Sequence, residues 1–204
     1  MFDTRLRQLI DPALNRMGAW VAHSGIGANA ITLAGAVLVV PLFYALLAQN
    51  WLAALALLAA NRLLDGLDGA VARIRGASAW GGYLDSLCDY VFYTAVPLGF
   101  AFASPANELS ALILVASFTL TAVSFLALAA IMAGRDLGHG NKAFTYSTGL
   151  MEGGETIAFF VAMCLFPALF PQLALLFAAL CLATVGQRLW LAYRLLSLPS
   201  APPR

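Results

Sequence analysis

Charged side chains are scarce in this chain. They make up 10% of its 204 residues, whereas 62% of the residues are hydrophobic and the mean hydropathy is +0.85. A soluble domain averages about 25% charged residues. The sequence therefore predicts an integral membrane protein with little room for a separate soluble domain.

Two further absences exclude classes of function. The net charge is only +1, and the chain shows no basic face of the kind that binds nucleic acid. The three cysteines, Cys88, Cys164 and Cys181, have the spacing of neither a zinc site nor a disulfide framework. We interpret them as buried free thiols within apolar segments.

Six apolar stretches are each long enough to cross a bilayer, which takes about 20 helical residues. They cover roughly residues 30–49, 51–73, 83–103, 109–134, 147–167 and 172–196. The segment 1–29 is too polar for a signal peptide, and its amphipathic pattern predicts a short interfacial helix. We expect an all-α integral membrane protein with this segment, a six-helix domain over 30–196 and a short tail over 197–204.

The distribution of Lys and Arg predicts the orientation of these spans. With a cytoplasmic N-terminus, the breaks at 74–82 and 135–142 and the C-terminus lie on the same side, and together with the N-terminal segment they carry most of the positive charges. The breaks on the opposite side contain no Lys or Arg. Because positive charges favour the cytoplasmic side, we expect both termini in the cytoplasm.

Four aspartates interrupt this apolar chain in the stretch DGLDGAVARIRGASAWGGYLDSLCD, residues 65–89. Asp65 and Asp68 are about 60° apart around the second predicted span, and Asp85 and Asp89 are about 40° apart around the third. Both pairs lie toward the cytoplasmic ends of neighbouring antiparallel helices. We therefore expect the four carboxylates to meet near the membrane surface.

Carboxylates that meet in a low-dielectric site must take up protons or bind cations. Oxygen-only ligands favour hard ions such as Mg²⁺, Mn²⁺ or Ca²⁺ over zinc. Four acids suit two divalent ions that clamp a phosphate or diphosphate. The glycines and alanines between the acids leave space for a bulky ligand, and Arg73 is placed to contact phosphate oxygens.

The pattern Asp65-x2-Asp68-Gly69-x2-Ala72-Arg73, followed by Gly81-x3-Asp85-x3-Asp89, resembles the signature of the CDP-alcohol phosphotransferases, or CDP-alcohol phosphatidyltransferases. The loop between Arg73 and Gly81 is one residue shorter than the family's usual form. The stretch GANAIT at residues 27–32 is similar to the family's segment before the first span. The stretches NRLLDGLDGA and GLMEGGET resemble the YnjF-like bacterial branch of the family.

The resemblance implies a phospholipid-synthesis enzyme of the bacterial inner (cytoplasmic) membrane, with its active site facing the cytoplasm. It implies that a phosphatidyl group passes from CDP-diacylglycerol to the hydroxyl of a small polar alcohol, and that CMP is released. The acceptor could be glycerol 3-phosphate, serine or an inositol-type alcohol. The resemblance also implies a homodimer.

The resemblance further implies roles for individual residues. Asp89 would be the general base, and two Mg²⁺ or Mn²⁺ ions would be held by Asp65, Asp68, Asp85 and Asp89. The nucleotide and its diphosphate would contact Asn29, Thr32, Asp68, Gly69, Ala72, Arg73 and Gly81.

Basic residues outside the motif are candidates for acceptor binding. Arg135, His139 and Lys142 form a cluster in the break at 135–142. They could bind a phosphorylated acceptor, or they could be ordinary positive charges of a cytoplasmic loop.

Two acidic residues of the fifth predicted span are also candidates for acceptor binding. Glu152 and Glu155 lie on one helical face, and acids within a membrane usually have a function or a partner. They could contact the acceptor, or they could pair with Arg62 or Arg188, which lie within spans. Arg62 could instead be a local partner of Asp65, three residues later.

A divalent-cation or proton-coupled transporter is the alternative function. Such a protein also carries intramembrane carboxylates, but it would place them near the middle of the membrane, between repeated halves with broken helices. In this chain the acids cluster toward one membrane face, and the second half does not echo the first. The sequence favours an enzyme.

We predict that replacing any of the four aspartates by Asn abolishes CMP release, because each carboxylate would be needed at the site. Membrane insertion should be unchanged, and fractionation of cell membranes checks this. A normal rate for Asp89→Asn would contradict its assignment as the base.

Overall fold

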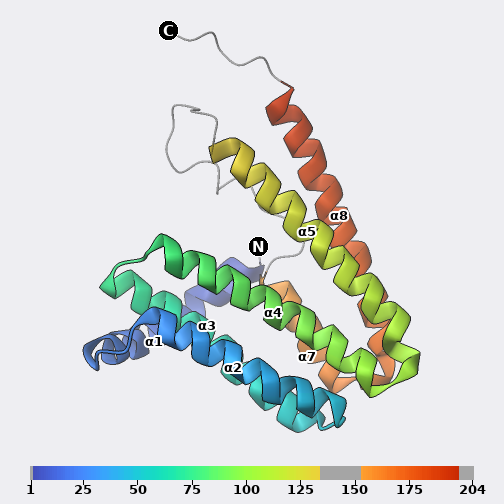
Figure 1. The fold of residues 1–204 in the computed structure, drawn as a ribbon, viewed down its shortest axis with the longest axis horizontal. Coiled ribbons are helices and arrows are strands. Elements are labelled where there is room, and N and C mark those ends of the chain that lie inside the picture. Colours follow the sequence, from blue (N-terminus) through green and yellow to red (C-terminus); the bar gives the residue numbers. More distant parts are fainter. Residues whose placement is uncertain (1, 134–152, 198–204) are drawn as a thin grey trace.

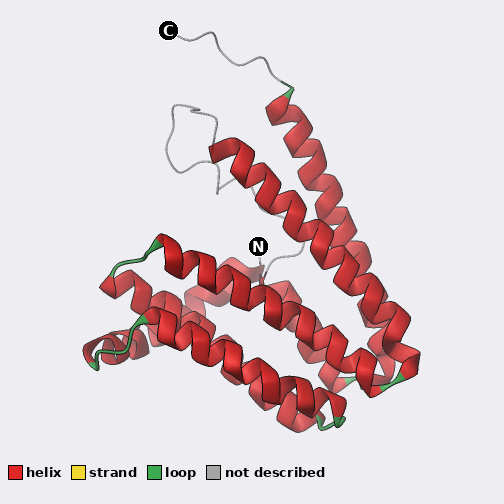
Figure 2. Cartoon of the chain, viewed as in Figure 1, coloured by secondary structure: helices red, strands yellow, loops and turns green. Residues whose placement is uncertain are grey.

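The computed structural model describes residues 2–133 and 153–197, and side chains from residue 12 onward within these ranges. The described residues form helices joined by short loops and include no strand (Figures 1 and 2). The long helices are α1 (Phe2–His23), α2 (Ala28–Leu47), α3 (Trp51–Arg75), α4 (Ala79–Ala103), α5 (Glu108–Ala133), α7 (Gly153–Leu165) and α8 (Phe170–Leu196). Two short 3₁₀ helices are η1 (Pro105–Asn107) and η2 (Pro167–Leu169).

Four segments are long and apolar enough to cross a membrane, namely α2, α4, Pro105–Met132 and Pro167–Leu196. The second and fifth predicted spans correspond to α3 and α7. α3 has 25 residues but carries charged side chains in its second half, and α7 has 13 described residues. The all-helical membrane class is confirmed, whereas the count of six spans and the orientation of the termini stay predictions.

The connection between α3 and α4 is shorter than the sequence indicated. The third predicted span was placed from residue 83, but α4 begins at Ala79, after an N-cap in which the backbone N–H of Gly81 donates to Oγ of Ser78 at 3.0 Å. The first turn of α4, residues 79–82, contains two glycines, so the apolar pattern alone does not indicate it. α3 ends at Arg75 before Gly76, whose φ of 98° lies in the left-handed region that favours glycine. Only residues 76–78 therefore separate the two helices.

Helices α2, α3 and α4 pack together, α1 packs on α3, and α5 pairs with α8. In Figure 1, α5 and α8 run side by side and lead away from the first four helices. The main hydrophobic core includes fully buried aromatic rings on α4, α7 and α8, which are Phe92, Phe100, Phe160, Phe170 and Phe177. The rings of Phe100 and Phe170 stack with centroids 4.4 Å apart and thereby tie α4 to α8.

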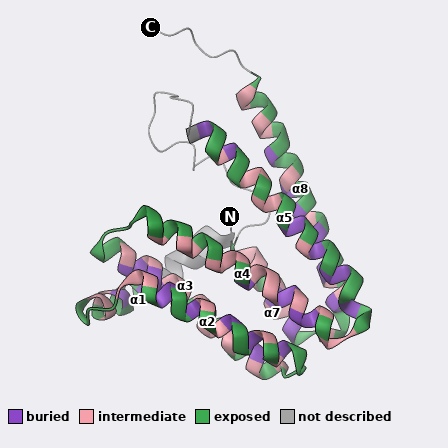
Figure 3. Cartoon of the chain, viewed as in Figure 1, coloured by how far each residue is buried: buried purple, intermediate pink, exposed green. Residues whose placement is uncertain are grey.

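The connections between helices gather at two ends of the molecule (Figure 1). The α1–α2 and α3–α4 connections lie at one end, and the α2–α3, α4–α5 and α7–α8 connections lie at the other. The end of α3 and the start of α4, which carry the aspartates, are therefore together at the first end. Figure 3 shows mostly exposed residues at the start of α4, whereas the end of α3 also carries buried residues.

The N-terminal helix is held against α3 by small residues. A Cβ built on Gly18 would lie 2.7 Å from Cβ of Ala70 and 3.3 Å from the backbone carbon of that residue. The predicted N-terminal helix is thus confirmed, and it lies directly on the helix that carries Asp65 and Asp68. Its predicted position at the membrane interface stays a prediction.

We predict that Gly18→Ala lowers the thermal unfolding midpoint of the purified protein in detergent. The added methyl group meets backbone that cannot yield as a flexible side chain can, and overpacking of this kind costs about 1–3 kcal/mol. Gly186→Ala is the control, because a Cβ there meets nothing within 4 Å. Equal midpoints for the two variants would show that α1 does not depend on this close approach.

Candidate functional site

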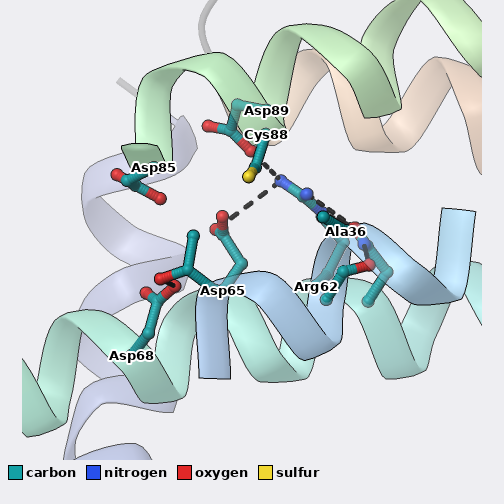
Figure 4. A pocket seen from close by; sticks show the side chains of 10 residues that line it. Ala36, Arg62, Asp65, Asp68, Asp85, Cys88 and Asp89 are labelled. Atoms are coloured by element: carbon teal, nitrogen blue, oxygen red, sulfur yellow. Dashed lines mark hydrogen bonds and ion pairs between the residues drawn. The ribbon is translucent and has the colours of Figure 1, made fainter. Parts of the chain in front are cut away.

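Three of the four predicted aspartates converge between α3 and α4. Asp65, Asp85 and Asp89 each offer a carboxylate oxygen, and these atoms all lie within 4.8 Å of one another. Figure 4 shows Asp65 reaching from α3 toward the two side chains of α4. The expected meeting of the two acidic helix faces is therefore found for these three residues. The three side chains are half-buried and line one cavity.

Asp68 lies at the edge of this group. It lines the same cavity but is almost fully buried, and its Oδ2 accepts a hydrogen bond from Oγ1 of Thr32 at 2.6 Å. Thr32 is on α2, so this bond joins α2 to α3. Asp68 is therefore positioned by a neutral donor rather than by the other carboxylates.

Arg62 is the positively charged neighbour of the acids. Its Nη1 lies 3.0 Å from Oδ1 of Asp89 and 3.5 Å from Oδ2 of Asp65 (Figure 4). Its Nε and Nη2 both donate to Oδ1 of Asn61, at 2.9 and 2.6 Å. Of the alternatives that the sequence left open for Arg62, partnership with the acid site is the one found. The spacing to Asp65 indicated this, but the contact with Asp89 depends on α2, which packs against both α3 and α4 and so brings their acidic ends together.

A second cavity, of about 160 Å³, lies beside the acids between α2, α3 and α4. Thr32, Asp68 and Asp85 line both cavities, so the two are adjacent. The family resemblance assigned seven residues to the nucleotide, and six of them line this second cavity. These six are Asn29, Thr32, Asp68, Gly69, Ala72 and Gly81. The sequence motif thus corresponds to one continuous surface.

Arg73, the seventh of these residues, is exposed at the rim. Its Nη2 donates to Oδ1 of Asn15 on α1 at 3.0 Å, and its Nη1 would lie 3.5 Å from a Cβ built on Gly69. Gly81 allows a close approach on the other side, since a Cβ there would lie 2.9 Å from Oδ1 of Asn29. The lack of a side chain at Gly81 thus lets Asn29 of α2 reach α4.

A third cavity, of about 200 Å³, lies between α4, α5, α7 and α8. Sequence reasoning missed it, because four distant segments contribute to it, through Tyr90, Tyr93, Phe118, Thr121, Phe125, Gly153, Thr156, Cys181 and Arg188. Nη1 of Arg188 donates to the carbonyl of Thr121 at 2.9 Å. The guanidinium carbon of Arg62 is 5.8 Å from the centroid of the Tyr93 ring, which places this cavity next to the acid cluster.

Most of the predicted acceptor residues lie outside the described part of the chain, namely Arg135, His139, Lys142 and Glu152. Glu155 is described, in the first turn of α7. Its Oε2 is buried, with no hydrogen-bond partner among the described residues. The structure thus places one of the five predicted acceptor residues, on a helix that contributes to the third cavity.

The three cysteines are free thiols, as expected. Cys164 and Cys181 are buried, but Cys88 is only half-buried, because it lies between Asp85 and Asp89 on α4 and lines the acid cavity. The expectation of burial was wrong for Cys88. The converging donors of the described cluster are carboxylate oxygens alone. This donor chemistry fits a hard divalent cation such as Mg²⁺ or Mn²⁺.

A protein-family model described as CDP-alcohol phosphatidyltransferase matches residues 26–190, which include all of the aspartate motif. The chain belongs to this family. It is therefore a membrane transferase of phospholipid biosynthesis, and the family membership expected from the aspartate motif is confirmed.

Two relatives support this assignment. The phosphatidyltransferase is 43% identical over 201 residues to the inner membrane protein YnjF of Escherichia coli, covering 95% of this chain and 96% of the relative. It is 30% identical over 167 residues to the archaetidylinositol phosphate synthase of Pyrococcus horikoshii, covering 81% and 83% of the two chains. The expected likeness to the YnjF branch is thus confirmed.

Two solved structures share the fold of this phosphatidyltransferase. Both are of phosphatidylinositol phosphate synthase (PgsA1) from Mycobacterium tuberculosis, one with CDP-DAG bound and one in complex with manganese and citrate. Each has a TM-score of 0.73 and 21% identity to this chain. The first match covers 94% of this chain and 97% of that one, and the second covers 94% and 92%.

We predict that the purified protein binds Mn²⁺ and that Asp85→Asn weakens this binding by about tenfold or more, because a charged hydrogen-bond acceptor is lost from a partly buried site. Titration followed by electron paramagnetic resonance measures the free ion. Glu108→Gln is the control, since Glu108 is an exposed acid in the first turn of α5. Equal affinities for the two variants would exclude a cation site at this cluster.

Proposed function

We propose that this enzyme transfers the phosphatidyl group of CDP-diacylglycerol to the hydroxyl of a small polar alcohol and releases CMP. The observation that carries the proposal is the convergence of Asp65, Asp85 and Asp89 beside a cavity lined by the rest of the motif. A PgsA1 structure with the same fold has CDP-DAG bound, which supports this donor.

Two Mg²⁺ or Mn²⁺ ions would be held by Asp65, Asp68, Asp85 and Asp89. When bound, such ions supply positive charge that stabilises a diphosphate as its bond to the leaving group breaks. The manganese in a PgsA1 structure supports this choice of ions. The hydrogen bond from Thr32 fixes Asp68 before any ligand arrives, and this limits the reorganisation that binding requires.

The cytidine diphosphate is proposed to lie in the cavity between α2, α3 and α4. Gly69, Ala72 and Gly81 leave space in its walls, and Asn29 and Thr32 present polar side chains from α2. Arg73 at the rim would contact phosphate or sugar oxygens. The acyl chains would extend into the bilayer along the apolar helix surfaces.

Asp89 is proposed as the general base. Its carboxylate would take the proton of the acceptor hydroxyl while the hydroxyl oxygen forms a bond to the β-phosphorus of the donor. The bond from that phosphorus to the oxygen bridging to CMP breaks, and CMP leaves with the electron pair. Proton transfer to a positioned group contributes about 10²–10⁴-fold to the rate. Asp89 is well placed for this, because Tyr90 and Tyr93, on the same helix, line the third cavity.

The acceptor alcohol is proposed to occupy the third cavity. Tyr90, Tyr93 and Thr121 offer polar groups there, and Arg188 offers a permanent positive charge that suits a phosphorylated alcohol. Glu155, on α7, would accept a hydrogen bond from an acceptor hydroxyl. Both the Pyrococcus relative and PgsA1 are named as synthases of inositol phosphate lipids, so an inositol phosphate is the first acceptor to test.

The basic residues Arg135, His139 and Lys142 could add to the binding of an anionic acceptor, and Glu152 could add to the recognition of its hydroxyls. The active site is proposed to face the cytoplasm, on the basis of the Lys and Arg distribution, and the YnjF relative is an inner membrane protein. The homodimer expected from the family stays a prediction.

The proposal is tested with purified protein, CDP-diacylglycerol, Mg²⁺ or Mn²⁺ and a panel of acceptors. The panel contains an inositol phosphate, inositol, glycerol 3-phosphate and serine, and CMP release is measured together with the lipid product. Release that depends on one acceptor supports the proposal and identifies the substrate. Cation uptake into vesicles without CMP release from any acceptor would support the transporter alternative instead.

We predict that two variants separate the donor site from the acceptor site. Gly81→Ala should raise the KM for CDP-diacylglycerol, because its methyl group displaces Asn29, and it should leave the KM for the acceptor unchanged. Arg188→Gln should raise the KM for a phosphorylated acceptor about tenfold or more, since a charge-assisted contact is lost, and leave the donor KM unchanged. Each variant serves as the control for the other.

If Arg188→Gln instead raised only the KM for CDP-diacylglycerol, the acceptor would have to bind outside the third cavity.

A further inference from the structure

Arg62 lies at the acid cluster but is not part of the aspartate motif. Its guanidinium touches acids on two helices, since Asp65 belongs to α3 and Asp89 to α4. The side chain is only 17% exposed, so its charge acts in a medium of lower dielectric than water. A guanidinium keeps its proton in proteins, so this charge is permanent.

The guanidinium is fixed from several sides. Two of its nitrogens donate to Oδ1 of Asn61, and the side-chain nitrogen of Asn61 donates to the carbonyl of Gly35 on α2 at 2.8 Å. One face lies over the fully buried ring of Phe92, with the guanidinium carbon 4.0 Å from the ring centroid. A chain of contacts therefore runs from the α2 backbone through Asn61 and Arg62 to Asp89. Arg62 has little freedom to swing away when a cation approaches.

We infer that Arg62 is a positioning residue, a fixed counter-cation that aims the Asp89 carboxylate and weakens the affinity of the cluster for divalent cations. This inference rests on the proposed function, in which Asp89 is both a ligand and the base. The hydrogen bond from Nη1 engages Oδ1 of Asp89 and thereby sets the direction of its second oxygen. The same positive charge repels a cation bound to Asp65, Asp85 or Asp89.

The two effects of Arg62 have opposite signs, and this makes them measurable. Without the guanidinium, no positive side chain offsets the charge of the three carboxylates or repels a cation bound there, so a divalent cation should bind more tightly. The Asp89 carboxylate, however, would then be free to rotate toward the cation with both oxygens, and its role as a base would suffer. A residue that merely supports folding would weaken both binding and turnover when replaced.

The test uses the full chain in detergent with Arg62→Met, which removes the charge but keeps much of the side-chain length, and Arg62→Lys, which keeps the charge but cannot form the planar fork. For Arg62→Met we expect Mn²⁺ to bind about tenfold more tightly, because a nearby like charge is removed. We expect kcat to fall about tenfold or more, because a positioned base is disturbed. Arg62→Lys should bind Mn²⁺ like the wild type and still show the lower kcat.

Arg75→Met is the matched control. Arg75 lies on the same helix, its Nη1 donates to the carbonyl of Gly25 at 2.8 Å, and it lines none of the three cavities. Neither its Mn²⁺ affinity nor its kcat should change. Tighter Mn²⁺ binding by Arg62→Met could not arise from an unfolded protein, so this readout also reports on folding.

Weaker or unchanged Mn²⁺ binding by Arg62→Met, in a wild type that binds Mn²⁺ and releases CMP, would overturn the inference alone. If Arg62→Lys also bound Mn²⁺ more tightly than the wild type, the positive charge of Arg62 could not be what weakens cation binding. A wild type that neither binds Mn²⁺ nor releases CMP from any acceptor would overturn the proposed function, and this inference with it.

Discussion

The repulsion among Asp65, Asp85 and Asp89 is the constraint on which the rest of this structure depends. Their oxygens lie within 4.8 Å of one another on two helices of an apolar chain. Two like charges 4 Å apart cost about 4 kcal/mol at an effective dielectric constant of 20. The helices must therefore be held together by contacts elsewhere, and the site needs positive charge. Arg62 supplies part of that charge, and the negative charge that it leaves unbalanced would attract a cation.

The frame that resists this repulsion is made of short connections and buried aromatic rings. Residues 76–78 join α3 to α4 with little slack, and the positive φ of Gly76 reverses the chain there. At the other end, Phe100 stacks on Phe170 and secures α4 to α8. Helices in a membrane associate through van der Waals packing rather than through release of water, and each well-placed aromatic pair adds about 0.5–1.5 kcal/mol. The packed rings of this core can therefore hold the acids in a geometry that they would not adopt alone. The binding geometry thus exists before the ligand arrives.

The parts of this site that could be predicted from sequence are those that depend on local helix geometry. The angular positions of Asp65, Asp85 and Asp89 follow from the helical repeat, and antiparallel neighbours bring them together. Asp68 could not be separated from the others in this way, because the hydrogen bond from Thr32 depends on how closely α2 packs. The start of α4 was missed because its first turn, residues 79–82, contains two glycines and follows the Ser78 cap rather than an apolar run. The third cavity was missed because no single segment carries its pattern.

The course of α4 explains how one helix can contribute to the proposed donor site on one side and to the proposed acceptor site on the other. Gly81, Asp85, Asp89 and Tyr93 are four residues apart, and in turn they line the second cavity, the acid cavity and the third cavity. A spacing of four exceeds the helical repeat by about 40° per step, so this stripe turns by about 120° from Gly81 to Tyr93.

The stripe therefore begins against α2 and α3 and ends facing α5, α7 and α8. The proposed donor site is built by α2, α3 and α4. The proposed acceptor site shares α4, and its other walls are built by α5, α7 and α8. Substitutions on α5, α7 and α8 can change the acceptor without disturbing the acids, because those helices contribute no residue to the first two cavities among the described parts of the chain. The turn of α4 thus separates the motif residues from the third cavity. This separation explains why the motif indicates the class of reaction but not the alcohol.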